Sequence, residues 1–231
     1  MARFRREFPS RRRLVPGTLI AFALCAALLA QLHKNGGASS STSSSFDYYL
    51  LSLSWAPEFC AQPGQAAANP GECGPGVAMK FAVHGLWPEA NVGKSPETCG
   101  PATKVPKGLV NQLLPYMPSA SLIQHEWATH GTCTGLTVDD FFTKVLLARA
   151  AVQVPVQISS IAAVETESPT EIETEFAGAN PGFPKGAFRT ACRSGALTEV
   201  RACFDKNIKG LACTASAGEC ASPTVTIGPP H

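Results

Sequence analysis

The order of apolar and polar residues predicts two strands early in the folded part of the chain. Between Tyr49 and Trp55, apolar residues alternate with Ser52 and Ser54. A period of two is typical of a strand that buries one face. A second, short apolar run over 79–83 predicts a buried strand.

Three later segments have the signals that begin helices. Ser121 and Gln124 fit a capping box, which predicts a helix over 122–130 that ends at a glycine. Thr137 resembles a second N-cap, because Asp140 follows it by three residues and an apolar helical pattern comes next. The tract Ser168-Pro169 opens a third helix, which we expect to end at residue 178.

The remaining segments predict loops and a C-terminal set of strands. The Gly- and Pro-rich segments 61–78 and 88–108 predict long loops. Residues 187–192, 199–204 and 224–227 predict strands joined by cysteine-bearing loops. Five glutamates between positions 165 and 175 predict a solvated face, and the sequence contains no internal repeat.

Residues 1–38 predict a signal peptide or an N-terminal anchor. Six arginines precede a nearly uncharged apolar run over 19–30, the order of an export signal. This run is shorter than the about 20 residues that span a bilayer, although an uncleaved anchor that begins near Leu14 stays an alternative. The Ser/Thr-rich tract over 39–45 predicts a flexible linker before the folded domain.

The charge of the chain argues against a general nucleic-acid clamp. The sequence has 19 Lys and Arg against 17 Asp and Glu, a formal charge of +2. Residues 1–38 hold seven of the basic and one of the acidic side chains, which leaves 12 against 16, or −4, for the rest. Because a nonspecific binder is normally basic, we expect any polyanion to bind at a local site.

Eight of the nine cysteines lie outside the leader, and we expect them to form four disulfides. An even count behind an export signal is typical of a disulfide framework and favours a secreted or periplasmic protein. Zinc ligation is the alternative, but no Cys-x-x-Cys spacing occurs. The eight residues are Cys60, Cys73, Cys99, Cys133, Cys192, Cys203, Cys213 and Cys220.

The three histidines between the leader and the last residue lie in two short tracts. Phe81–Pro88 contains His84, and His125–Cys133 contains His125 and His130. Histidine is the side chain whose unperturbed pKa allows it to exchange protons near neutrality. Their grouping indicates one acid–base site.

Two imidazoles and a carboxylate suit paired general acid and base catalysis. On the predicted helix, Glu126 and His130 share a face through their i, i+4 spacing, and His125 lies at its edge. His84 is expected at the end of the second strand. RNA carries its own nucleophile, because the 2′-OH lies beside the scissile phosphate, and Trp87 could pack on its sugar or base.

A zinc site is the main alternative chemistry. His125-Glu126 followed by His130 resembles the zinc-peptidase pattern His-Glu-x-x-His. The second histidine stands at i+5 here, so the two imidazoles diverge by about 140° around the helix. We therefore expect no metal and no cofactor. Trp127 has two open interpretations, packing and binding, and the glycines of both tracts are expected to serve turns and caps.

At these residues the chain resembles the ribonuclease T2 family of secreted, acid-type ribonucleases. The two histidine tracts resemble the family's two active-site segments, and their joint occurrence in this order is highly specific. The likeness also covers Leu51–Trp55, Cys60 and the segments 189–192 and 197–206, so that it includes essentially all of residues 46–228.

The resemblance implies an α+β fold in which a central antiparallel sheet is flanked by helices and stapled by disulfides. It implies a catalytic domain over 46–231 that cleaves single-stranded RNA, not DNA, through 2′,3′-cyclic phosphates with low base specificity. We expect a monomer, with no membrane contact beyond a possible N-terminal anchor. The implied pairings are Cys60–Cys73, Cys99–Cys133, Cys192–Cys220 and Cys203–Cys213.

The resemblance also implies a role for each residue of the site. His130 is the base that takes the 2′-OH proton, and His84 is the acid that protonates the 5′-oxygen leaving group. Glu126 assists at the phosphate as a third catalytic residue. His125 and Trp87 bind the substrate.

One position departs from the family pattern. Thr129 stands where the family usually has Lys, so a hydroxyl replaces a full positive charge beside the phosphate. This departure keeps a second function open, a secreted RNA-binding or signalling protein on the same scaffold with weak or no turnover. The lysines that could substitute are Lys80, Lys94, Lys104 and Lys107.

Overall fold

A computed structural model of the chain describes residues 45–218 and 220–230. The predicted leader over 1–38 lies outside these residues, as does the predicted linker apart from Ser45. Within the described ranges, no helix is both long enough and apolar enough to cross a membrane.

Six strands form one mixed sheet in the described part of the chain, in the order β2-β1-β5-β6-β3, with β4 also paired to β5. The central pairs are antiparallel, as expected, whereas β6 joins β5 in the parallel direction through a single pair of residues. The strands are β1 (Tyr48–Trp55), β2 (Phe81–Glu89), β3 (Glu165–Glu167), β4 (Phe188–Arg193), β5 (Ala196–Phe204) and β6 (Val225–Ile227).

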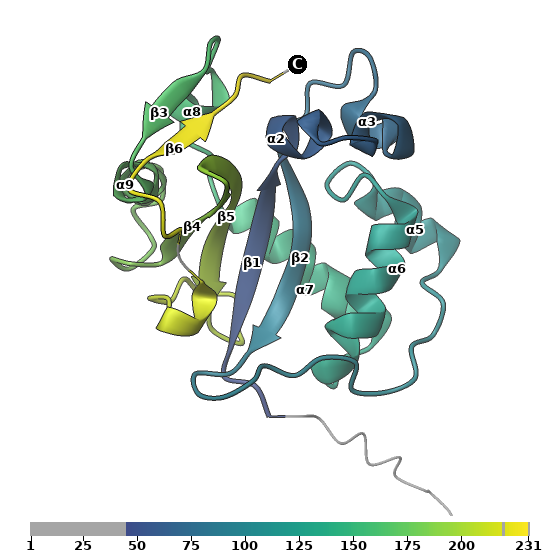
Figure 1. Cartoon of the computed structure of the whole chain (residues 1–231). Coiled ribbons are helices and arrows are strands. Elements are labelled where there is room, and N and C mark those ends of the chain that lie inside the picture. Colours follow the sequence, from purple (N-terminus) through teal and green to yellow (C-terminus); the bar gives the residue numbers. More distant parts are fainter. Residues whose placement is uncertain (1–44, 219, 231) are drawn as a thin grey trace, which may run out of the picture. The chain divides into compact units, whose positions relative to one another are not determined.

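Helices surround this sheet (Figure 1). Figure 1 shows α2 and α3 at one end of β1 and β2, α5 and α6 beside β2, and α7 behind the sheet. The helices are α2 (Ala56–Ala61), α3 (Gln65–Ala68), α4 (Pro70–Cys73), α5 (Lys107–Leu113), α6 (Ala120–Thr129), α7 (Val138–Ala151), α8 (Val156–Ser159) and α9 (Pro169–Ala179).

The alternation predicted for the first strand is confirmed in β1. Leu51, Leu53 and Trp55 are fully buried in the main core, while Ser54 turns to the opposite face and lines a groove. Ser52 is also buried, although it is polar. β1 pairs with β2 on one edge and with β5 on the other. The strand is therefore central in the sheet.

Two of the three predicted helix starts are confirmed. The side chains of Thr137 and Ser168 accept hydrogen bonds from the backbone N–H groups of Asp140 and Glu171. The Glu171 carboxylate in turn accepts a hydrogen bond from the backbone N–H of Ser168, which completes a capping box. Both caps satisfy N–H groups that the helix itself leaves unpaired.

The start predicted for α6 is wrong by two residues. Ser119, not Ser121, has the extended backbone of an N-cap, and its hydroxyl accepts from the N–H of Leu122. Gln124 does not complete a capping box, because its side chain bonds the backbone of the loop before α5 instead. A tertiary contact thus overrides a local sequence signal.

The disulfide pairings implied by the resemblance are all present. Cys60–Cys73 closes the first part of the segment over 61–78, which was predicted as a loop but contains the short helices α3 and α4. Cys99–Cys133 ties the loop after β2 to the end of α6. The second bridge therefore links the chain segments that carry the two histidine tracts.

Candidate active site

A β-bulge sets the direction of His84. The register of β2 against β1 shifts between Ser52 and Leu53, so that His84 is an extra residue in β2. An extra residue reverses the alternation of side chains along a strand. His84 and Trp87 consequently share one face although they are three residues apart, and both line the groove. The prediction that His84 lies at a strand end is corrected, because β2 continues past it.

Gly85 permits a close approach between β2 and α6. A Cβ atom at this position would collide with Oε2 of Glu126 and with Nε1 of Trp87. Gly131 has a similar role beside the six-membered ring of Trp127. Steric contact, and not a turn, is therefore the reason for glycine at position 85.

Trp87 lies beside His84 of the first tract and His130 of the second. Its ring centroid is 5.1 Å from that of His84 and 5.5 Å from that of His130. The two imidazoles are therefore at most 10.6 Å apart, the sum of these separations. The fold brings the two tracts into one site from a strand and a helix end.

Glu126 is buried between the histidines and the tryptophan. Its side chain is 1% exposed, its Oε2 accepts a 3.0 Å hydrogen bond from Nε1 of Trp87, and its Oε1 is 3.9 Å from Nε2 of His84. Burial raises the pKa of Glu126 to about 7, although His84 and Trp87 oppose the shift. This carboxyl can therefore carry a proton at mildly acidic pH.

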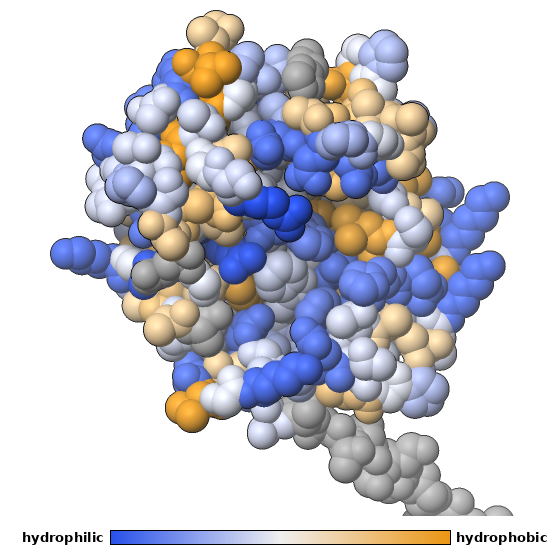
Figure 2. Space-filling view, viewed as in Figure 1, coloured by the Kyte–Doolittle hydropathy of each residue, from blue (hydrophilic) through white to orange (hydrophobic). Residues whose placement is uncertain are grey.

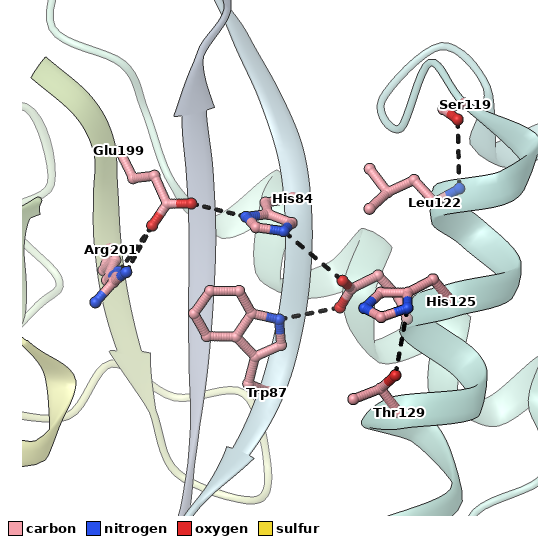
Figure 3. Close-up of polar contacts among 9 residues, drawn as sticks. His84, Trp87, Ser119, Leu122, His125, Thr129, Glu199 and Arg201 are labelled. Atoms are coloured by element: carbon pink, nitrogen blue, oxygen red, sulfur yellow. Dashed lines mark hydrogen bonds and ion pairs between the residues drawn. The ribbon is translucent and has the colours of Figure 1, made fainter. Parts of the chain in front are cut away.

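Glu199 and Arg201 complete the site, and the sequence did not single out either as a site residue. Oε1 of Glu199 lies 2.7 Å from Nδ1 of His84, and Oε2 accepts bonds of 2.9 and 2.8 Å from Nε and Nη2 of Arg201 (Figure 3). A third bond joins Nη1 of Arg201 to the carbonyl of Ala217 at 2.9 Å. The available signal was their i, i+2 spacing in β5, which places both side chains on one face of the sheet.

The Glu199 carboxylate determines which ring nitrogen of His84 donates a hydrogen bond to it. Burial would raise the pKa of Glu199, but the hydrogen bond from His84 and the charge of Arg201 hold it at about 2. An ionised carboxylate can only accept, so Nδ1 of His84 is the donor. Nε2 of His84 is then the nitrogen that faces Glu126 and the groove.

The two imidazoles have pKa shifts of opposite sign. Burial lowers the pKa of His130 to about 4. Burial would also lower the pKa of His84, but the hydrogen bond and charge of Glu199, together with the charge of Glu126, raise it instead. At a pH above the pKa of His130 and below that of His84, the ring of His130 is neutral while the ring of His84 is charged.

The groove has a volume of about 810 Å³ and extends from His84, Trp87 and Glu199 toward α2, α3 and α4. His130 lies beside Trp87 but is not among the lining residues. Figure 2 shows hydrophilic side chains gathered around a hollow at the centre of this face. His125 is exposed and lines the groove, with its Nδ1 3.5 Å from Oγ1 of Thr129. Arg193 and Arg201 line the groove, and no lysine of the described residues does. Thr129 and His130 are not among the lining residues either, so the four lysines named as substitutes stay a prediction.

Trp127 packs in the core, which decides between its two interpretations. Its side chain is 6% exposed and its ring lies 5.9 Å from that of Phe141. In the described part of the chain, no three His, Cys, Asp or Glu side chains are grouped as a metal ion would require.

In comparisons with known proteins, the chain matches ribonucleases. The family described as the Ribonuclease T2 family matches residues 46–214. A probable ribonuclease of Haemophilus influenzae is 32% identical over 178 residues, which cover 72% of this chain and 61% of that protein. A ribonuclease of Aeromonas hydrophila is 31% identical over 166 residues, which cover 70% of this chain and 73% of that protein. The match to the Haemophilus protein thus spans less than two thirds of its length.

Solved structures show the same fold. The RNase-related protein from Calystegia sepium has a TM-score of 0.64 at 20% identity, over 80% of this chain and 98% of that one. RNase NT in complex with 5′-AMP has a TM-score of 0.60 at 18% identity, over 81% of this chain and 100% of that one. The expected α+β fold is therefore confirmed.

Proposed function

Because the chain belongs to the ribonuclease T2 family, we propose that it is a metal-independent endoribonuclease that cleaves single-stranded RNA by transphosphorylation to 2′,3′-cyclic phosphates. The observation that carries this proposal is that His84 and His130, which both contact the ring of Trp87, have pKa shifts of opposite sign. A general base must be neutral and a general acid must be protonated at the same pH.

His130 is the general base of the proposed first step. Its imidazole is neutral above about pH 4. Its Nδ1 is buried without a hydrogen-bond partner among the described residues, whereas its Nε2 keeps contact with solvent. Nε2 takes the 2′-OH proton, the 2′-oxygen bonds to phosphorus, and the bond from phosphorus to the 5′-oxygen breaks.

His84 is the general acid of the same step. Its Nδ1–H is held by Glu199, so the proton on Nε2 is directed into the groove. This proton passes to the departing 5′-oxygen, which leaves as a hydroxyl. The proton lost by the 2′-OH remains on His130, and hydrolysis of the cyclic phosphate by water returns both histidines to their starting states.

Glu126 and the arginines act on the phosphate. Below its raised pKa of about 7, the Glu126 carboxyl can donate its proton to a phosphoryl oxygen. Arg193 and Arg201 line the groove and contribute positive potential near the site. His125 and Trp87 bind the substrate, as the resemblance implies.

We further propose that the protein acts in an oxidising compartment as an exported monomer. Four disulfides within the described residues support this proposal, because such bridges persist outside the reducing cytosol. Residues 1–38 then serve as signal peptide or anchor, 39–45 as linker and 46–231 as the catalytic domain.

An assay in EDTA tests the reaction itself. The oxidised protein is incubated with single-stranded RNA, and the ends are examined for cyclic phosphates. His84→Ala and His130→Ala should each lose turnover while RNA affinity stays within a few-fold. His125→Ala is the control, because it should weaken RNA binding more than it lowers kcat.

Two outcomes would contradict the proposal. Full activity in either catalytic variant would remove that residue from the mechanism. RNA binding without any cleavage between pH 4 and 8 would favour the alternative, a secreted RNA-binding or signalling protein on this scaffold.

A further inference from the structure

The groove continues past His84 to a wall that the proposed chemistry does not use. This wall is formed by the short helices α2, α3 and α4, which follow β1 directly. Its lining residues include Phe59, Gln62, Gln65 and Glu72. The volume of about 810 Å³ falls within the range of small-molecule and cofactor sites.

Glu72 is a buried carboxyl without a partner in this wall. Only 8% of the residue is exposed, and its side chain makes no hydrogen bond within the described residues. Neither carboxyl oxygen of Glu72 is fully buried, so both keep contact with solvent. Because Glu72 lines the groove, that contact is through the groove.

The backbone that carries Glu72 is fixed on both sides. Cys73 is joined to Cys60 by a disulfide. A Cβ atom at Gly71 would lie 2.9 Å from the carbonyl oxygen of Pro118, so α4 packs directly on that segment. The backbone that carries the carboxyl is therefore held in place at the groove.

Donor groups lie beside this acceptor. Oε1 of Gln65 accepts a 2.8 Å hydrogen bond from Asn69, which leaves the Gln65 amide N–H groups for a ligand. Gln62 adds a second amide to the same wall. A ligand that fits would present two donors to Glu72 and an acceptor to an amide.

The charged groups around Glu72 come from several elements. His84 on β2 acts on it directly, and His125 on α6, Arg193 on β4, and Glu199 with Arg201 on β5 line other parts of the groove. Of the packed helices, α3 has no titratable residue and α2 has Glu58, which does not line the groove. Burial raises the pKa of Glu72 to about 7, against the opposing charge of His84.

We propose that Glu72 reads the nucleobase on the 3′ side of the scissile bond and that its carboxylate selects guanine. The inference rests on the proposed function, because His84 protonates the 5′-oxygen and so lies on the side of the leaving nucleoside. Guanine presents N1–H and N2–H as adjacent donors, which a carboxylate can accept together. Its O6 is the acceptor that an amide of Gln62 or Gln65 would meet.

The preference changes with the protonation of Glu72. A protonated carboxyl offers one donor and one acceptor. That pattern matches N1 and N6 of adenine or N3 and N4 of cytosine, and the protonated group can no longer accept from both N1–H and N2–H of guanine. Guanine is therefore preferred when Glu72 is ionised at alkaline pH, and adenine and cytosine gain as the pH falls.

Dinucleotide kinetics test this proposal with the oxidised full-length protein. The values of kcat/KM are measured for UpG, UpI, UpA, UpC and UpU at pH 5.5 and pH 8. Ratios between substrates at one pH cancel the ionisation of His84 and His130, because all substrates need the same acid and base. UpI lacks the N2 amino group and isolates one of the two contacts.

We expect the UpG/UpA ratio to be about 5- to 150-fold higher at pH 8 than at pH 5.5, the range that a good bidentate base contact supplies. UpI should fall between UpG and UpU at pH 8. Glu72→Gln should remove the pH dependence of the ratio, while Glu58→Gln on α2 should keep it. Unfolding transitions check that both variants fold.

A pH-independent ratio in the wild type, or a folded Glu72→Gln with the wild-type profile, would overturn the base-reading role and leave the nuclease intact. Failure to cleave any dinucleotide or longer RNA would instead contradict the proposed function.

Discussion

Replacing Glu199 with Gln separates the charge of this residue from its shape. The variant keeps a side chain of the same size beside Nδ1 of His84 but removes the negative charge. Glu199 raises the pKa of His84 both through its hydrogen bond and through its charge. The variant should therefore lower the pKa of His84 and leave less of the protonated acid at neutral pH.

The geometry sets the size of the effect. Hydrogen bonds to charged groups contribute about 1.5–3 kcal/mol, and an opposite charge nearby shifts a pKa by about 1–3. The contact is short, at 2.7 Å, but 38% of the His84 side chain is exposed, so solvent screens part of the interaction. We therefore expect an effect at the lower end of these ranges: a fall of about tenfold in kcat and a decrease of about one unit in the pKa of His84.

The profile of kcat/KM against pH is the assay. Its acid limb should lie near pH 4, where His130 must lose its proton, and its alkaline limb should report His84. Glu199→Gln should move the alkaline limb to lower pH. Arg201→Gln should move it to higher pH, because the charge of Arg201 opposes protonation of His84.

The opposite directions make the reasoning refutable. A purely structural role for Glu199 would reduce rate and stability in both variants without moving the limb. Movement of the limb in the same direction in both variants would show that the charges of Glu199 and Arg201 do not act on His84 as inferred.

Two further substitutions test other parts of the site. Thr129→Lys should raise kcat, by at most the 10²–10³ that one donor to a developing oxyanion is typically worth; no gain in a folded variant would show that the charge is supplied elsewhere. Gly85→Ala should lower the free energy of unfolding in urea by about 1–3 kcal/mol and reduce kcat, because the added methyl would displace Glu126 or Trp87; unchanged stability would show that these side chains shift without cost.

The sequence determined the elements whose signals are local. Alternation over residues 49–55 predicted β1, and the caps at Thr137 and Ser168 predicted the starts of α7 and α9. The two histidine tracts predicted one site, because each tract holds its residue types within a few positions. Period, cap chemistry and short motifs need only neighbouring residues, so they can be read without the fold.

The tertiary structure decided what depends on distant partners. His84 contacts Glu199, which lies 115 positions later in the sequence, and no pattern around either residue predicts the contact. The bulge that turns His84 and Trp87 to one face arises from pairing between β1 and β2. Glu72 gains its role only because the fold buries its carboxyl in the wall of the same groove. Burial and long-range pairing set pKa values, and both exist only after the chain has folded.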